Sequence, residues 1–217
     1  MAAILRSIGR LGKAAFPGLR DRLARELEGC ESVLDLGCGR SSFLRYCRVP
    51  YSVGVELHEP YIRESERTGI HSEYILADVR TTVFKQGSFD CVLAMDVLEH
   101  LSRDEGFGLI EAMEGLARKK TIIVTPNGFL RQGEYDKNPL QTHRSGWTVD
   151  DLRRLGYRVK GMRGWRPLRK EESQFRVKPK IVAKLLTSLT LAVTHHCPKS
   201  AFQLLAVKSI VSNRGGE

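Results

Sequence analysis

The sequence has little of what disulfide-stabilised, zinc-binding or membrane-spanning proteins need. Its five cysteines are an odd number and none form a CxxC pair, so neither a disulfide framework nor a zinc site is expected. No apolar run approaches the roughly 18 to 20 residues that span a bilayer. The first residues also lack the uninterrupted apolar core of a signal peptide. We therefore expect a reduced, cytoplasmic protein.

Acidic residues are scarce in the last part of the chain. The formal net charge is +10, and residues 160–217 contain twelve Lys and Arg against three acidic residues, while the first 159 residues are nearly balanced. This pattern indicates a basic extension on a balanced domain, so nucleic acid is not the expected partner of the core. A non-catalytic adaptor that binds RNA or an anionic membrane through this extension is one alternative. With 217 residues, the chain is expected to form a single domain, 1–217.

The amino-terminal extension, residues 1–29, is predicted to contain two helices. Apolar residues recur at helical spacing over residues 1–16, with Arg6, Arg10 and Lys13 between them. This first helix either packs onto its own domain, lies on a membrane surface or serves as an organellar address. Pro17 and Gly18 break it, and a second helix is expected over residues 19–27.

A glycine turn follows the first predicted strand. Residues 32–36 are an apolar run that contains Asp35, and Gly37 and Gly39 come directly after it. The pattern predicts strand, turn and helix, with Ser41 or Ser42 as the N-cap. An ordinary strand-to-helix turn has the same appearance. The dinucleotide fingerprint GxGxxG would require a glycine at position 42, so Ser42 weakens the nicotinamide interpretation, although an oxidoreductase on the same sheet stays an alternative.

Strands and helices then alternate. Predicted strands cover residues 51–57, 73–79, 89–97 and 121–125, with helices over residues 60–68 and 102–120. This order predicts a parallel, doubly wound α/β sheet whose ligand lies at the carboxyl ends of the strands. Glu56 ends the second strand, where a carboxylate can accept hydrogen bonds from both ribose hydroxyls. A surface glutamate is the simpler alternative.

Two motifs carry a family resemblance. Residues 33–39, Val-Leu-Asp-Leu-Gly-Cys-Gly, closely resemble the first motif of class I S-adenosylmethionine-dependent methyltransferases. Residues 97–101, Val-Leu-Glu-His-Leu, are similar to a run in the type 11 branch. The resemblance implies S-adenosylmethionine as cofactor and a seven-stranded Rossmann-like sheet whose last strand, residues 201–210, is antiparallel to the others.

The same resemblance assigns residues to the cofactor. The glycine turn would pass under the methionine part, and Asp35 would orient its amino group. Asp78 would meet the adenine amino group and the backbone of Val79 the ring, while the main chain near Met95 and Asp96 would lie against the methionine part. The predicted cofactor site consists of Asp35, Gly37, Cys38, Gly39, Glu56, Leu57, Asp78, Val79, Met95 and Asp96.

The acceptor side is expected in the polar loop of residues 129–147, which follows the fifth strand and should overhang the transferable methyl group. His143 in this loop is the candidate catalytic residue, to orient the acceptor or act as general base. A loop histidine bonded to the backbone is an equal alternative. Glu99 and His100 are interpreted as helix-start contacts, and no metal site is expected.

The acceptor is predicted to be a small molecule, a glycan or a lipid-linked compound, either neutral or anionic. Nucleic acid is not expected, because the Asn-Pro-Pro-Tyr signature of amino methylation is missing after the fourth strand. An insertion, residues 164–198, separates predicted strands 157–162 and 201–210. Its first half is basic, with Arg166, Arg169, Lys170, Arg176, Lys178 and Lys180. Its second half predicts an apolar helix after Pro179. Three roles are considered for this helix: a cap on the core, a lid over an anionic or lipid-linked acceptor, or a dimer face. With a lipid-linked acceptor, the protein would contact the membrane peripherally.

Overall fold

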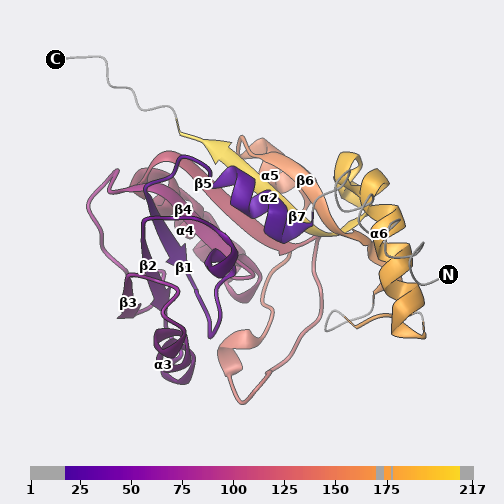
Figure 1. The fold of residues 1–217 in the computed structure, drawn as a ribbon, viewed down its shortest axis with the longest axis horizontal. Coiled ribbons are helices and arrows are strands. Elements are labelled where there is room, and N and C mark those ends of the chain that lie inside the picture. Colours follow the sequence, from indigo (N-terminus) through magenta and orange to yellow (C-terminus); the bar gives the residue numbers. More distant parts are fainter. Residues whose placement is uncertain (1–17, 170–173, 177, 211–217) are drawn as a thin grey trace.

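Seven strands form one mixed sheet (Figure 1). The computed structural model describes residues 18–169, 174–176 and 178–210, so the predicted helix over residues 1–16 and Lys170 lie outside the described residues. The sheet order is β3-β2-β1-β4-β5-β7-β6, and β7 is antiparallel to both neighbours. This confirms the predicted Rossmann-like sheet. The strands are β1 (Ser32–Leu36), β2 (Tyr51–Glu56), β3 (Glu73–Leu76), β4 (Phe89–Met95), β5 (Ala117–Pro126), β6 (Arg158–Trp165) and β7 (Ala201–Ser209).

Helices cover both faces of the sheet, because the central strands are apolar on both sides. Val33, Leu93 and Ile122 pack with α2 (Leu19–Glu26) on one face. Leu34, Val92 and Ile123 point to the opposite face, where they pack with α4 (Arg103–Leu116) and α5 (Val149–Arg154). Figure 1 shows α2 in front of the sheet and α4 behind it. Burial on both faces is what a doubly wound parallel sheet requires.

Local capping signals set the starts of α4 and α5 and the end of α3. Ser102 accepts from the backbone of Glu105, whose carboxylate bonds back to the Ser102 N–H, a capping box that starts α4. Thr148 caps α5 in the same way. Helix α3 (Glu59–Thr68) packs against β2 and β3 and ends at Gly69, which has a left-handed backbone with φ of 61°.

The prediction of a helix after the glycine turn is wrong. A single 3-10 turn, η1 (Phe43–Tyr46), occupies this place, and Ser42 caps it by accepting from the Leu44 N–H. Pro50 disfavours a helical residue before it, and β2 begins at Tyr51, so the segment has no room for several α-helical turns. The site therefore has no α-helix N-terminus at this turn.

The predicted end of the helix over residues 102–120 is also wrong. Helix α4 ends at Leu116, and β5 already begins at Ala117. Arg118 and Lys119 do not lie at a helix C-terminus, since their side chains bond Asp90 at the start of β4, at 3.0 and 2.8 Å. This interaction with a neighbouring strand extends β5 by four residues, and helical spacing cannot reveal it.

The insertion between β6 and β7 forms α6 (Lys180–His196). Figure 1 shows α6 at the outer edge of the sheet, where it packs against β6. Gly161 permits this close approach, because a Cβ there would overlap the Thr194 carbonyl. In the described part of the chain, no helix has both the length and the apolar character that crossing a membrane requires.

Candidate functional site

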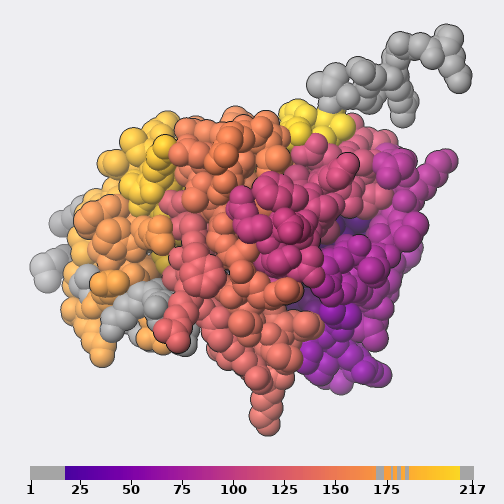
Figure 2. Space-filling model, turned by 180° about the vertical axis from the view of Figure 1, so that it is seen from behind, coloured from indigo at the N-terminus to yellow at the C-terminus, as the bar shows by residue number. Residues whose placement is uncertain are grey.

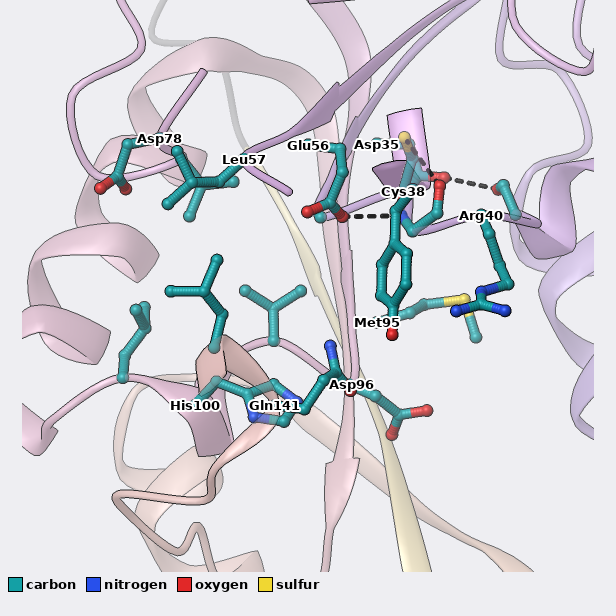
Figure 3. Close-up of a pocket in the computed structure, with 18 of the residues that line it drawn as sticks. Asp35, Cys38, Arg40, Glu56, Leu57, Asp78, Met95, Asp96, His100 and Gln141 are labelled. Carbon is teal, nitrogen blue, oxygen red and sulfur yellow. Dashed lines mark hydrogen bonds between the residues drawn. The ribbon is translucent and has the colours of Figure 1, made fainter. Parts of the chain in front are cut away.

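A cavity of about 450 Å³ opens at the carboxyl ends of the parallel strands. This size is typical of small-molecule sites. Figure 3 shows Asp78, Leu57 and Glu56 along one side of it and His100, Gln141 and Asp96 along the opposite side. The structure brings all ten predicted cofactor residues to its wall, namely Asp35, Gly37, Cys38, Gly39, Glu56, Leu57, Asp78, Val79, Met95 and Asp96.

The glycine turn needs glycine for two reasons. Gly37 has φ of 71°, in the left-handed region, and a Cβ there would lie 2.5 Å from Val97 Cγ2. The turn is fixed to β2, because the N–H groups of Gly37 and Cys38 both donate to the Val55 carbonyl. At Gly37 and Gly39 the wall of the cavity thereby consists of backbone alone.

Glu56 is held by the backbone on both of its oxygens. Oε2 accepts from the Gly39 N–H at 3.0 Å, and Oε1 accepts from the His58 N–H at 2.7 Å. Each carboxylate oxygen has a second lone pair, so both oxygens can still accept from a ligand. The two backbone bonds fix the orientation of the carboxylate before a ligand arrives.

Asp35 is a buried carboxylate with no charged partner. Its Oδ2 accepts from Ser42 Oγ at 2.5 Å. Burial raises the pKa of Asp35 to about 7, although the Ser42 hydrogen bond opposes this, and the charge of Glu56 adds to it. His71 Nε2 lies 3.6 Å away, but burial lowers the pKa of His71 to about 4, so this imidazole is neutral where Asp35 titrates. Asp35 can thus receive a cationic group of a ligand.

Asp78 is fixed by an ionic network that ends in the loop. The Arg80 guanidinium bonds both oxygens of Asp78, with Nε at 3.0 Å from each, and this hydrogen bonding lowers the pKa of Asp78. Arg80 also pairs with Glu105, whose Oε2 accepts from Arg144 at 2.9 Å. The network joins the end of β3, the first turn of α4 and the loop around one end of the cavity.

The loop of residues 129–147 closes the cavity from the other side. Asp136 in this loop pairs with Arg40, which follows the glycine turn, and accepts from the Tyr61 hydroxyl of α3 at 3.2 Å. Figure 2 shows the loop (salmon) beside the purple surface of the first strands and α3. Sequence reasoning missed Arg40, Tyr61 and Asp136, because no local pattern signals a contact across so many residues.

Trp147 anchors the end of this loop in the core. Its side chain is fully buried, and its Nε1 donates to the Leu98 carbonyl at 3.3 Å. The neighbouring Ser145 Oγ donates to the same carbonyl, and the Arg144 and Ser145 N–H groups donate to the Glu99 carbonyl. The loop is therefore fastened along the segment that follows β4.

His143 is brought to Glu99 and His100 by this anchoring. Its ring is buried and lies edge-on to His100, with centroids 4.8 Å apart, while His100 lines the cavity. His143 Nδ1 lies 2.6 Å from the Leu130 carbonyl, so the histidine is bonded to the backbone, as the simpler sequence interpretation expected. Burial lowers the pKa of both histidines, and burial followed by the charge of Asp96 raises the pKa of Glu99 well above its usual range.

The sequence was compared with family models and with curated proteins. A family model described as a methyltransferase domain matches residues 34–125, which begin within β1 and include β2 to β4 and nearly all of β5. No curated protein matches the chain.

Solved structures with similar folds are numerous. A SAM-dependent methyltransferase from Archaeoglobus fulgidus is 19% identical, with 92% of this chain and 98% of that chain covered and a TM-score of 0.55. One from Mesorhizobium loti is 17% identical, with 88% and 95% covered and a TM-score of 0.56. The N-terminal domain of EvdMO1, solved in the presence of SAH and D-fucose, is 15% identical, with 95% and 97% covered and a TM-score of 0.58. At these identities the likeness concerns the fold.

Proposed function

Since this chain is a class I S-adenosylmethionine-dependent methyltransferase, we propose that it methylates an anionic small molecule, glycan or lipid-linked acceptor. The observation that supports the anionic character is a second cavity, of about 400 Å³, rich in arginine. Its wall consists of Phe129, Leu130, Arg131, Arg166, Pro167, Arg169, Arg176 and Phe202.

The residues of the first cavity fit the cofactor. S-adenosylmethionine, when bound, supplies a methyl group on its sulfonium sulfur. The acceptor nucleophile would take this methyl group directly, and S-adenosylhomocysteine would be the leaving group. In our proposal Asp35, a buried carboxylate without a charged partner, holds the amino group of the cofactor. Glu56 presents both carboxylate oxygens to the ribose hydroxyls. The chain contributes mainly by aligning the acceptor with the methyl group and excluding water.

The arginine cavity suits a phosphate or carboxylate on the acceptor. Guanidinium groups bind such anions through charge-assisted and often bidentate hydrogen bonds. The Arg169 guanidinium lies over the Phe175 ring at 4.3 Å from its centroid, and burial, followed by the charge of Arg163, lowers the pKa of Arg169 to about 10. Arg169 remains charged at neutral pH.

His143 lies between the two cavities. Its Nδ1 bonds the carbonyl of Leu130, which lines the arginine cavity, and its ring contacts His100, which lines the cofactor cavity. His143 therefore connects the walls of the two cavities. The role of His143 in orienting the acceptor or accepting its proton stays a prediction.

The acceptor can be identified by transfer of a labelled methyl group. We expect that the protein, incubated with methyl-labelled S-adenosylmethionine and fractionated metabolites, labels an anionic fraction, with a mass gain of one methyl group. Labelling only of neutral compounds would contradict the proposed acceptor class, and labelling of nothing but RNA would favour a nucleic-acid acceptor.

Charge reversal separates the arginine cavity from the lid hypothesis. Arg166→Glu combined with Arg176→Glu is expected to lower kcat/KM for the anionic acceptor by about 10-fold or more, because two charge-assisted contacts are lost. Lys178→Glu with Lys180→Glu, at the start of α6, tests the lid. These variants are to be compared by initial rates at saturating cofactor. A loss only in the lysine pair would favour the lid and contradict the role of the arginine cavity.

Asp78 is expected to select adenine by accepting from its amino group. Asp78→Asn should weaken S-adenosylhomocysteine more than the inosine analogue, in which the amino group is replaced by a carbonyl. Because Asp78 also holds Arg80, Arg80→Gln is the control for the ionic network. Calorimetric titrations with both ligands provide the comparison, and equal losses in Asp78→Asn would leave Asp78 with a structural role only.

A further inference from the structure

Three potential metal ligands meet beside the cofactor cavity. Glu99, His100 and His143 each offer one ligand atom, and these atoms all lie within 4.8 Å of one another. Glu99 and His100 belong to the turn η2 (Leu98–His100) directly after β4, while His143 comes from the loop that Trp147 anchors. The fold therefore brings His143 to two ligands that lie more than forty residues earlier in the chain.

Both imidazoles are arranged as metal ligands usually are. His143 Nδ1 lies 2.6 Å from the Leu130 carbonyl, and His100 Nδ1 lies 3.3 Å from the Thr142 carbonyl. A carbonyl only accepts, so each Nδ1 carries the proton and each Nε2 of the neutral ring keeps a lone pair. A backbone carbonyl that fixes the tautomer from behind is the common outer partner of metal-binding histidines.

The carboxyl groups of Glu99 and Asp96 in and beside this cluster are held by neutral hydrogen-bond donors. Glu99 is 2% exposed and its carboxylate accepts from Thr125 Oγ1 at 2.9 Å. Asp96 lies close by, where its Oδ1 accepts from Gln203 Nε2 at 2.7 Å. Among the ion pairs of the described residues, none includes Asp96 or Glu99. A buried carboxyl group without a Lys or Arg partner is neutralised either by a proton or by a bound cation.

We propose that Glu99, His100 and His143 bind one divalent first-row transition metal ion, such as Zn²⁺, Co²⁺ or Mn²⁺. Two imidazole nitrogens with one carboxylate oxygen match the preferences of these ions, whereas Mg²⁺ prefers oxygen ligands alone. Three protein ligands leave coordination positions open, as in catalytic metal sites. His100 lines the cofactor cavity and lies opposite Glu56 and Asp78 (Figure 3), so the ion would lie on the acceptor side.

The open position would take an oxygen atom of the acceptor. This consequence rests on the proposed function. Coordination lowers the pKa of a hydroxyl, so its proton leaves for solvent and the oxygen becomes the better nucleophile. An oxygen–carbon bond to the methyl group then forms while the carbon–sulfur bond breaks, and the electron pair of that bond stays on sulfur. The products are the methyl ether of the acceptor and S-adenosylhomocysteine.

Cobalt titration tests the site on the whole protein without any methyl transfer. After treatment with a chelator, the wild type is expected to bind one Co²⁺ per chain with visible d–d absorption and without a thiolate charge-transfer band. His143→Gln and Glu99→Gln should each weaken Co²⁺ binding by more than about 10-fold. His196→Gln, which changes an exposed histidine of α6, is the matched control and should bind as the wild type does.

Folding of each variant is checked by circular dichroism and by S-adenosylhomocysteine binding, since the predicted cofactor residues include neither Glu99 nor His143. Because the wild-type titration needs no variant, a wild type that binds no Co²⁺ overturns the proposal even if the variants fail to fold. Binding that His143→Gln and Glu99→Gln leave unchanged overturns it as well. Failure of S-adenosylhomocysteine to bind a protein that takes up Co²⁺ would contradict the proposed function and leave the metal site standing.

Discussion

Replacing Glu56 with alanine is expected to weaken S-adenosylhomocysteine binding by about 10- to 100-fold, the range for loss of hydrogen bonds to a charged group. Two effects combine in this variant. The ribose would lose its acceptor, and the Gly39 and His58 N–H groups would lose the carboxylate that orients the glycine turn and the start of α3. Isothermal titration calorimetry measures the change directly.

Glu59→Ala is the matched control for this prediction. Glu59 is exposed, three residues further along the chain, and its carboxylate bonds Arg63 on the surface of α3. We expect wild-type affinity in this control and a partial loss in Glu56→Gln, which keeps one acceptor oxygen. If Glu56→Ala bound the ligand as tightly as the wild type, Glu56 would be a surface glutamate without a ribose contact.

The second large effect concerns the pH dependence of stability in the ligand-free protein. The pKa of Asp35 is raised from 3.8 to about 7 in the fold, mainly by burial. Between these values the folded state holds a proton that the unfolded state has released, so the contribution of Asp35 to stability is complete below pH 4 and is lost as the pH rises to 7. The loss is on the order of 4 kcal/mol.

Asp35→Asn should remove this dependence, so the variant gains stability relative to the wild type between pH 4 and pH 8. Urea unfolding at a series of pH values gives the free energy of unfolding for both proteins, and Asp104→Asn controls for loss of an exposed carboxylate. If the free energies of unfolding of Asp35→Asn and the wild type differed by the same amount at every pH from 4 to 8, Asp35 would be charged over this whole range. Saturating S-adenosylhomocysteine should reduce the dependence, since its amino group would stabilise the charged carboxylate.

The parts of the site that were predicted from the sequence lie at strand ends. The apolar runs that end near Asp35, Glu56 and Asp78 mark parallel strands, and parallel strands bring their carboxyl ends to one edge of the sheet. Topology alone therefore gathers these side chains, and the glycine turn adds the open backbone between them. No precise helix boundary was needed for this conclusion.

The remaining parts depend on contacts between distant segments. The sequence predicted a helix after the glycine turn, but Ser42 is used to bond Asp35 and to cap a short turn. The pairing of Arg40 with Asp136 likewise has no local signal. Glu99 and His143 were each noticed, yet only the bonds of the loop to the Leu98 and Glu99 carbonyls show that they meet. Tertiary hydrogen bonds of this kind leave no periodic pattern.

Side-by-side calorimetry with S-adenosylhomocysteine and NAD decides whether the cavity between Glu56 and Asp96 holds S-adenosylmethionine. We expect S-adenosylhomocysteine to bind at one molecule per chain, with competition by S-adenosylmethionine, and NAD to give no saturable heat. Saturable binding of NAD without binding of S-adenosylhomocysteine would contradict S-adenosylmethionine as the cofactor and favour an oxidoreductase on the same sheet.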